Sequence, residues 1–310
     1  MTQRPQSAPV GPANLTPMAA LLLTIPPLLW AGNAVVGRMV APLISPMTLN
    51  LLRWLLAFCL LLPLATWVLR PGSPLWAQWR RFLLLGLLST SGYNALLYLA
   101  LNTSTPINVT LVGASTPVWM LLIGRMVYGQ AISGRQMLGA ALSIAGVVLV
   151  MSRGEWAQLA GLRLVVGDVY VLLASMGWAY YSWLLARPTP ESASIRVDWA
   201  AFLLGQIVFG LVWSLAFASV EWGLTDARLH WGWPLAAALV FIACGPAVVA
   251  YRSWGAGVGR AGPAVAGFFI NLTPLFTALL SSAVLGEAPQ LFHGLAFALI
   301  VSGIVLSSRR

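Results

Sequence analysis

Tryptophan, tyrosine and asparagine side chains recur inside the long apolar stretches of this chain. Trp30, Asn33 and Gly37 are spaced i, i+3 and i+7, so a helix places them on one face. Trp178 and Tyr181 stand 148 residues after the places of Trp30 and Asn33. Ring faces, indole N–H groups and phenol O–H groups can hold a small molecule. Packing of helices against one another accounts for the same residues equally well.

Further polar residues stand near the middle of other apolar stretches. Polar groups in a membrane face the protein interior or a wet cavity, because lipid offers them no partner. Hydrogen bonding between helices explains any one of them, but their concentration at similar depth favours a pocket. We therefore predict a substrate site that is formed by Trp30, Asn33, Tyr93, Asn94, Trp178, Tyr181 and Tyr251.

Arg53 is the best candidate for a charge inside the membrane, about two turns into the second apolar stretch. An intramembrane arginine is a functional hypothesis in its own right, and here it would contact a carboxylate of the substrate. The alternative is that Arg53 reaches the outer surface or binds carbonyls at a helix end. No carboxylate is expected at mid-membrane, which argues against antiport of drug cations through a buried Glu. Proton coupling through Asp168 or another route stays open.

The residue types that catalysis or metal binding requires are scarce. The chain has seven carboxylates and two histidines, and these do not cluster. Cys59 and Cys244 both fall in apolar stretches, so neither a disulfide nor a metal site is implied. We expect no catalytic residue, no metal and no cofactor. A membrane-embedded enzyme such as a lipid or prenyl transferase is therefore disfavoured, and a non-transporting membrane protein or a channel is a further alternative.

The composition is that of a membrane protein. Hydrophobic residues make up 59% of the 310 residues, charged residues 8%, and the mean hydropathy is +0.85. A soluble domain has roughly 25% charged residues. The net charge of +10 comes from arginines alone, since there is no lysine, and these arginines lie between apolar runs. We expect the lipid bilayer as a partner and no nucleic acid.

Counting about 20 apolar residues per helix gives ten transmembrane spans. We predict an all-α polytopic membrane protein, with residues 1–16 as a disordered cytoplasmic N-terminus. The predicted spans are 17–40, 46–69, 82–101, 106–127, 135–151, 165–186, 198–219, 235–257, 263–284 and 290–307. Twelve of the seventeen arginines then fall on the side of the N-terminus. Cytoplasmic loops are rich in such residues, so both termini are predicted to be cytoplasmic.

The chain contains a repeat with a constant offset of 157 residues. Its landmarks are the pairs Pro106/Pro263, Pro117/Pro274, Gly129/Gly286 and Gly146/Gly303. We therefore predict two related five-helix halves, residues 17–152 and 163–307. Because five is odd, the second half enters the membrane in the opposite direction, and the repeat is inverted. Inverted repeats are typical of secondary transporters that work by alternating access.

Pro117 and Pro274 lie in the middle of the fourth and ninth predicted spans. A proline removes one backbone hydrogen bond and frees the carbonyl four residues earlier, here at Gly113 and Ile270. In lipid that carbonyl needs a partner inside the protein or in a wet cavity. Paired kinks at the same depth favour a cavity at this place, and bending for the sake of packing is the alternative.

The motifs together resemble the EamA-type carriers of the drug/metabolite transporter superfamily. They are Trp30-Ala31-Gly32-Asn33, Arg53-Trp54, the pair Pro106 and Pro117, and Gly286-Glu287 followed by Gly303. The resemblance implies a bundle around a central cavity, in the bacterial cytoplasmic membrane, that exports amino acids or related metabolites. Gln130 stands where the second half has Glu287. Exchange of sugar phosphates or nucleotide sugars is the alternative, which the lack of lysine disfavours.

We thus expect a secondary exporter of a small molecule that rocks its two halves around a midplane cavity. Protons are a candidate coupling ion. A monomer and a homodimer are both compatible with the sequence.

Overall fold

The computed structural model describes residues 15–160, 162–189, 193–285 and 288–309. Within these ranges, ten helical stretches are long and apolar enough to cross a membrane, which confirms the predicted all-α polytopic fold. An isolated antiparallel bridge joins Ile44 and Leu229. Most of the predicted N-terminal segment 1–16 and the Gly286-Glu287 motif lie outside the described residues.

The spans are made of helices with the following bounds. The first five are α1 (Pro17–Val40); α2 (Pro46–Ala65) with η1 (Thr66–Leu69); α4 (Trp79–Gly86), η2 (Leu87–Ser91) and α5 (Gly92–Leu101); α6 (Pro106–Gly113) and α7 (Thr116–Tyr128); and α8 (Gly134–Ser152). The second five are α9 (Val166–Ala186); α11 (Trp199–Leu224); α12 (Trp233–Ile242), η5 (Ala243–Val249) and α13 (Ala250–Ala261); α14 (Pro263–Ile270) and α15 (Leu272–Leu285); and α16 (Leu291–Ser308). Short helices α3 (Pro74–Ala77), η3 (Trp156–Leu159) and α10 (Ala193–Val197) lie in the links.

Two predicted span ends were wrong by several residues. The link after the seventh span was predicted to begin at residue 220, but α11 continues to Leu224, so Glu221 lies in the last turn of a helix. The eighth helical stretch runs over Trp233–Ala261 rather than 235–257. Tryptophan and charged residues are tolerated where a helix leaves the hydrocarbon, so an apolar count ends the span too early.

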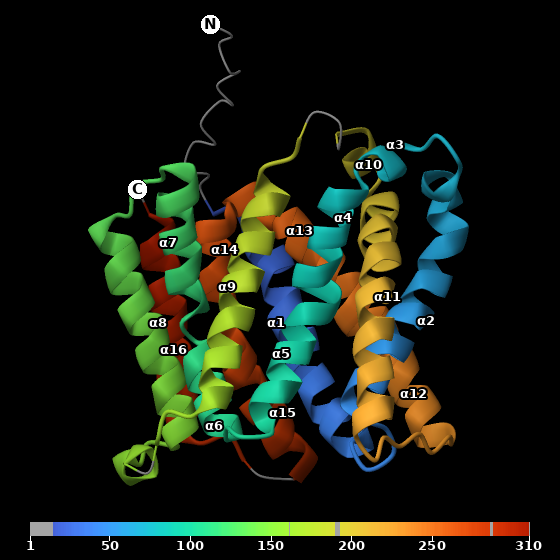
Figure 1. Cartoon of the computed structure of the whole chain (residues 1–310). Coiled ribbons are helices and arrows are strands. Elements are labelled where there is room, and N and C mark those ends of the chain that lie inside the picture. The colour runs from blue at the N-terminus through green and yellow to red at the C-terminus, as the bar shows by residue number, and fades with distance from the viewer. Residues whose placement is uncertain (1–14, 161, 190–192, 286–287, 310) are drawn as a thin grey trace, which may run out of the picture.

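The helices contact one another in corresponding sets (Figure 1). α8 packs along α16 at one edge of the bundle, and α2 packs along α11 at the other. Between these edges α1 contacts α13 and α15, while α9 contacts α5 and α7. α1 and α9 are the first helices of the two halves, and their partners correspond in the same way, α13 to α5 and α15 to α7. Each half therefore repeats the contacts of the other.

Glycines bring α8 and α16 into backbone contact. A Cβ atom at Gly139 would lie 2.7 Å from the Gly303 carbonyl oxygen, and one at Gly303 would lie 2.6 Å from the Gly139 carbonyl oxygen. Gly146 approaches the Ala296 carbonyl oxygen in the same way, at 2.9 Å. Small residues allow such close approach of helices in membranes.

The third and eighth spans both change to π-helix near their middles. η2 covers Leu87–Ser91, and η5 covers Ala243–Val249. Adding 157 to the bounds of η2 gives 244–248, which lies inside η5. A π turn displaces the regular hydrogen-bond ladder and often occurs at functional sites. The two interruptions therefore stand at equivalent places of the repeat.

The fourth and ninth spans are broken at the predicted prolines. α6 ends at Gly113, and α7 begins at Thr116 just before Pro117. The Gly113 carbonyl accepts a hydrogen bond from the Thr116 hydroxyl at 2.7 Å. α14 ends at Ile270 and α15 begins at Leu272.

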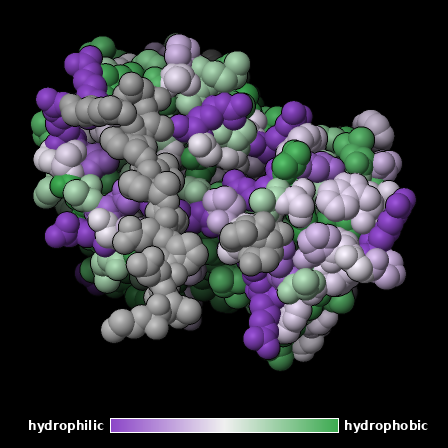
Figure 2. Space-filling view, turned by 90° about the horizontal axis from the view of Figure 1, so that it is seen from above, coloured by the Kyte–Doolittle hydropathy of each residue, from purple (hydrophilic) through white to green (hydrophobic). Residues whose placement is uncertain are grey.

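Hydrophilic residues gather on the face that is seen from above in Figure 2. This face holds the end of α2, the start of α4 and the ends of α7, α9 and α13 (Figure 1). Arginines stand at or beside each of these helix ends: Arg70, Arg80, Arg125, Arg187 and Arg260.

Candidate functional site

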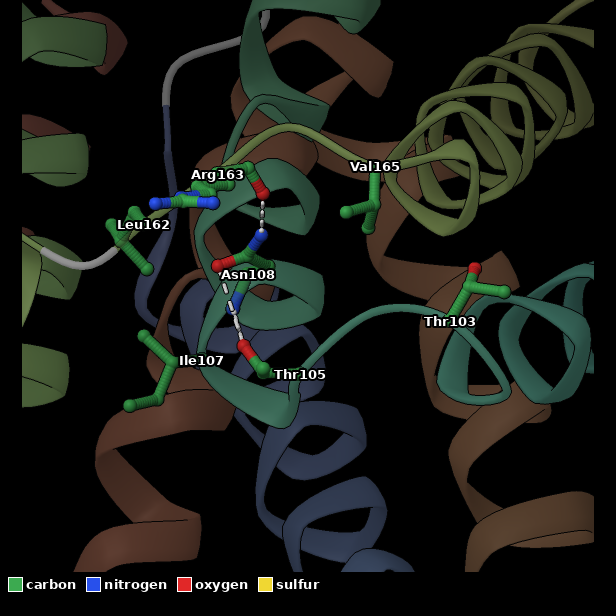
Figure 3. A pocket seen from close by; sticks show the side chains of 7 residues that line it. All are labelled: Thr103, Thr105, Ile107, Asn108, Leu162, Arg163 and Val165. Atoms are coloured by element: carbon green, nitrogen blue, oxygen red, sulfur yellow. Dashed lines mark hydrogen bonds between the residues drawn. The ribbon is translucent and has the colours of Figure 1, made fainter.

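Two surface hollows lie at helix ends, away from the predicted site. One, of about 320 Å³, opens between the α5–α6 link and the segment before α9 (Figure 3), where the Asn108 amide donates to the Arg163 carbonyl at 2.8 Å. Its lining consists of Thr103, Thr105, Ile107, Asn108, Leu162, Arg163 and Val165. The other, of about 620 Å³, lies on α7. Neither lining includes a predicted site residue. Of the predicted residues, Arg53, Asn94, Trp178, Tyr181 and Tyr251 are buried, and Trp30, Asn33 and Tyr93 are half-buried.

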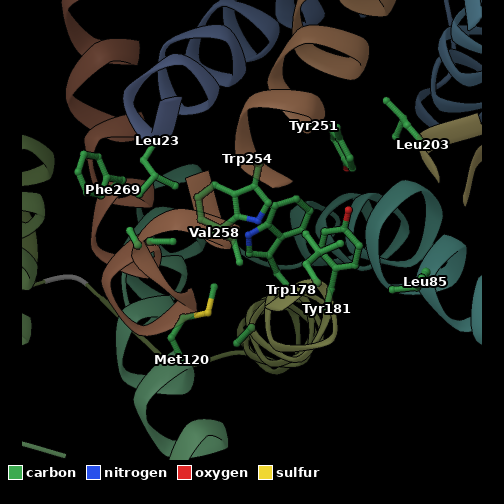
Figure 4. Packing of buried hydrophobic residues seen from close by; sticks show 14 of the residues in the cluster. Leu23, Leu85, Met120, Trp178, Tyr181, Leu203, Tyr251, Trp254, Val258 and Phe269 are labelled. Atoms are coloured by element: carbon green, nitrogen blue, oxygen red, sulfur yellow. The ribbon is translucent and has the colours of Figure 1, made fainter. Parts of the chain in front are cut away.

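Trp178 of α9 is the centre of a buried aromatic cluster (Figure 4). Its ring centroid lies 5.2 Å from that of Trp30, 5.7 Å from that of Tyr93 and 5.1 Å from that of Tyr181. The Tyr251 and α13 Trp254 rings lie 5.7 and 5.6 Å from it. The structure thus brings together the five aromatic residues that the sequence predicted.

The aromatic cluster is defined by seven rings from both halves of the chain: Trp30, Trp54, Tyr93, Trp178, Tyr181, Tyr251 and Trp254. Trp54 joins it edge-on through Tyr251, at a centroid distance of 5.0 Å and an interplanar angle of 84°. Such edge-to-face pairs each add about 0.5–1.5 kcal/mol beyond the burial of area. Trp54, Trp178 and Trp254 are at most 4% exposed.

Two of the rings are anchored on equivalent carbonyls of the π segments. The Tyr251 hydroxyl donates to the Ser89 carbonyl in η2 at 2.6 Å. The Trp30 indole N–H donates to the Pro246 carbonyl in η5 at 3.2 Å. Ser89 and Pro246 are 157 residues apart, so they are repeat equivalents. Each hydrogen bond joins one half of the chain to the other.

Other side chains fix the remaining rings. The Tyr181 hydroxyl donates to Gln206 Oε1 of α11 at 2.9 Å. The Trp254 indole donates to the Ser182 hydroxyl at 3.2 Å, and that hydroxyl donates to the Trp178 carbonyl. The cluster is therefore positioned by α9, α11, α13 and the π segments together.

Arg53 is buried, with 7% of its surface exposed, and lies beside the cluster. Its guanidinium carbon is 5.3 Å from the Trp54 ring centroid. Its Nη2 donates to Asn50 Oδ1 at 2.6 Å, while the Asn50 amide donates to the Thr90 carbonyl in η2 and to Ser214 of α11. Arg53 is thus held by a polar network of α2, η2 and α11.

Three buried donors, two in the cluster and one beside it, have no acceptor within the part of the chain that the structure describes. They are Arg53 Nε, Trp54 Nε1 and Trp178 Nε1. A buried donor that lacks an acceptor is unfavourable by about 1–3 kcal/mol. An acceptor on a bound molecule, such as a carboxylate, would satisfy these groups.

The two predicted asparagines are placed differently from the rings. The Asn94 amide is buried and donates to the Thr90 carbonyl, which also accepts from Asn50. Asn33 is half-buried on α1, one turn from Trp30, and makes no hydrogen bond to the described residues. Asn94 therefore belongs to the polar network of Arg53, whereas Asn33 stands apart from it.

The prolines mark a polar crossing between the two halves. Asn271, at the break before Pro274, donates through its amide to the Ala114 carbonyl at 3.3 Å, beside the break before Pro117. It also donates to the Ser143 hydroxyl of α8 at 2.9 Å. These hydrogen bonds join the break before Pro274 to the break before Pro117 and to α8, and none of them involves a ring of the aromatic cluster.

Sequence reasoning left Trp54, Trp254 and Gln206 out of the predicted site. Trp254 follows Tyr251 by three residues, so helical spacing was the signal for it. Trp54 directly follows Arg53, and adjacent residues of a helix do not share a face, so spacing gave no signal for it. The π segments had no such signal, because a shifted hydrogen-bond ladder leaves no periodic pattern. Within the described residues, no group of three His, Cys, Asp or Glu residues could hold a metal ion. The arrangement suits binding rather than covalent chemistry.

Comparison with known proteins gives one matching family model, that of the EamA-like transporter family, over residues 17–152 and 165–309. An uncharacterized transporter from Archaeoglobus fulgidus is 27% identical over 94% of this chain and 97% of its own. The aromatic amino acid exporter YddG from Ancylobacter novellus is 22% identical over 78% of each chain. A solved crystal structure aligns with a TM-score of 0.72 at 22% identity, covering 93% of this chain and 95% of the other.

Proposed function

Because the chain belongs to the EamA-like transporter family, we propose that it exports small metabolites, chiefly amino acids and related compounds. It is a multi-pass transporter of the inner membrane, not an enzyme. The observation that carries the proposal is the aromatic cluster with three unpartnered buried donors, the indoles of Trp54 and Trp178 and the adjacent Arg53 Nε. Ring faces suit an apolar or aromatic side chain, and the donors suit a carboxylate.

The relative from Ancylobacter novellus supports the substrate class, since its name specifies aromatic amino acids. The same chemistry is offered here by Trp54 and Trp178, whose indole N–H groups are available, and by Arg53. We therefore expect substrates that combine a carboxylate with apolar or aromatic surface. Sugar phosphates carry more negative charge than one buried arginine can balance.

Alternating access is the proposed mechanism, with residues 17–152 and 163–307 as two inverted halves. The exchanged contacts of α1 and α9 support it, as do the paired π segments. In the present arrangement the rings pack against one another. Rocking of the halves would separate rings that come from different halves, such as Trp30 and Tyr251, and open a cavity between them.

The proposed orientation places both termini in the cytoplasm. The arginines at the helix ends on the face of Figure 2 support it, because positively charged residues favour the cytoplasmic side. Export then runs toward the face that carries the α1–α2 and α11–α12 links.

Counterflow in proteoliposomes tests the proposal. Vesicles that contain the purified chain are preloaded with a mixture of unlabelled amino acids, and uptake of labelled tracers is followed with and without a proton gradient. We expect accelerated uptake of aromatic and apolar amino acids, which protein-free vesicles do not show. The Trp178→Ala and Tyr181→Ala variants, purified at equal yield, should transport less.

Absence of counterflow for every amino acid would overturn the proposed substrate class. Unchanged kinetics in both variants would show that the aromatic cluster is not the binding site. A response to the imposed gradient would identify the proton as the coupling ion.

A further inference from the structure

The hollow of about 620 Å³ on α7 lies toward the end of the bundle that carries the termini (Figure 1). Its lining consists of Leu122, Arg125, Met126 and Gly129. These residues are spaced i, i+3, i+4 and i+7, so they form one stripe along the helix. Met126 is 80% exposed, and Arg125 and Gly129 are exposed as well. The hollow therefore opens on the outside of the bundle, where lipid surrounds the chain.

Gly129 leaves the end of the hollow unfilled. It ends α7 in the left-handed region, with φ 66°, and its N–H donates to the Arg125 carbonyl at 3.1 Å. Glycine is the residue that adopts this conformation without strain. A Cβ atom at Gly129 would meet no atom within 4 Å, so there is room beside the main chain.

Three exposed arginines surround this edge of the bundle. Arg125 lies in the last turn of α7, Arg135 in the first turn of α8, and Arg309 directly after α16. Gly139 and Ser307 hold α8 and α16 together one turn away, since a Cβ atom at Gly139 would lie 3.2 Å from the Ser307 Cβ. Arg135 and Arg309 therefore lie at the same end of this helix pair.

The charge of these arginines is not neutralised by the part of the chain that the structure describes. Their guanidinium groups make no hydrogen bond, ion pair or ring contact with the described residues. α7, α8 and α16 carry no carboxylate within their bounds. This edge thus has an excess of positive charge that an anion would balance.

The start of α8 adds two donors. The Ser133 hydroxyl accepts from the Gln136 N–H at 3.2 Å, and the Ser133 carbonyl accepts from the Met137 N–H. The N–H groups of Gly134 and Arg135 come before these and have no acceptor among the described residues. Such N–H groups and the helix dipole favour an anion.

Apolar side chains lie deeper in the membrane than the arginines. Leu122 precedes Arg125 on α7 by one turn, and exposed Met137 and Leu138 follow Arg135 on α8. Methionine is flexible and adapts to irregular apolar partners. Positive groups at the helix ends with apolar surface below them match the order of a phospholipid, whose phosphate lies at the interface and whose acyl chains lie inside.

We propose that this hollow binds an anionic phospholipid of the leaflet on the side of the termini. The phosphate contacts Arg125 and Arg135 at the start of α8, and an acyl chain follows the stripe of Leu122 and Met126. A second copy of the chain fits less well, because a twofold contact through this patch would bring the same arginines together. The site depends on the membrane fold and not on the transported substrate.

Native mass spectrometry of the purified chain, released from detergent micelles, tests the site. It resolves each bound lipid and gives the Kd for phosphatidylglycerol and for phosphatidylcholine with the same acyl chains. An arginine near the membrane surface strengthens binding of anionic lipid about fivefold. With two such residues on one phosphate, we expect phosphatidylglycerol to bind at least about tenfold more tightly than phosphatidylcholine.

Variants assign the binding to this hollow. Arg125→Gln and Arg135→Gln remove exposed groups without partners, so both should fold, and each should weaken phosphatidylglycerol binding about fivefold. Arg70→Gln is the matched control, since Arg70 is exposed on the same face but at the edge of α2 and α11. It should leave the Kd unchanged. Met126→Ser should weaken binding of both lipids and keep the preference for phosphatidylglycerol.

Equal Kd values for the two lipids in the native chain would overturn the proposal. So would an equal loss in Arg70→Gln, because the preference would then belong to the whole basic face. Displacement of phosphatidylglycerol by an equal concentration of inorganic phosphate would indicate a site for a free anion instead. Dimers that Arg125→Gln dissociates in lipid-free detergent would indicate a second copy as the occupant.

Discussion

The hydrogen bond from Tyr251 to the Ser89 carbonyl gives the sharpest test of how the two halves are held together. Tyr251→Phe removes the hydroxyl and keeps the ring, so the edge contacts with Trp54 and Trp178 remain. The Ser89 carbonyl then loses a donor at 2.6 Å in a buried setting. Leaving such a group unpaired destabilises a protein by about 1–3 kcal/mol, while interhelical hydrogen bonds in membranes average about 0.6 kcal/mol.

We therefore expect Tyr251→Phe to lower the free energy of unfolding by about 1 kcal/mol, or roughly fivefold in the unfolding equilibrium constant. Tyr93→Phe is the matched control. Tyr93 belongs to the same aromatic cluster, but its hydroxyl makes no hydrogen bond to the described residues. Its removal should change the stability little.

Reversible unfolding in mixed detergent micelles with rising sodium dodecyl sulfate, followed by circular dichroism, measures both variants. Equal stabilities of Tyr251→Phe and Tyr93→Phe, within about 0.3 kcal/mol, would refute the reasoning. The π-segment carbonyl would then not hold the halves together through this tyrosine.

Three further predictions concern charge, packing and pH. Arg53→Gln should raise the KM for carboxylate substrates in counterflow about tenfold, the value of one charge-assisted hydrogen bond; an unchanged KM would remove Arg53 from the site. Gly139→Ala should destabilise the chain by about 1–3 kcal/mol, because the added Cβ would lie 2.7 Å from the Gly303 carbonyl oxygen of α16. Gly294 has open space around it, so Gly294→Ala should be neutral or stabilising in the same unfolding assay. Burial raises the pKa of Asp198, but hydrogen bonds from the Trp67 indole and two backbone N–H groups of α11 outweigh burial and lower that pKa. The ionised Asp198 therefore stabilises the fold above the usual carboxyl pKa, and this stabilisation is lost as the pH falls through the lowered pKa. Asp198→Asn should accordingly be less stable than the native chain at neutral pH and lose less stability in acid.

The sequence predicted the fold well because lipid imposes a simple rule. Apolar runs of sufficient length gave all ten spans, and errors such as the end of α11 arose where Glu221 and Trp222 extend a helix beyond its apolar run. Glu221 is tolerated there because α2 supplies its partners. That contact joins residues 174 positions apart, which no local pattern reveals.

The candidate site was predicted only in part. Helical spacing found Trp30, Trp178 and Tyr181, since period alone decides which residues share a face. The roles of the π segments depended on tertiary contacts, because the acceptors are main-chain carbonyls that any residue provides. The residue types of Ser89 and Pro246 therefore gave no signal, although their carbonyls accept hydrogen bonds from the Tyr251 hydroxyl and the Trp30 indole N–H.

The equivalent carbonyls of Ser89 and Pro246 also bear on the history of the chain and its resting state. In a symmetric ancestor of two identical copies, one kind of donor would have served both carbonyls, and exchanging the copies would have left the energy unchanged. Here a phenol occupies one place at 2.6 Å and an indole the other at 3.2 Å. If the two halves exchange conformations as proposed, the exchanged conformations differ in energy, and the difference between the two donors contributes to the bias between them.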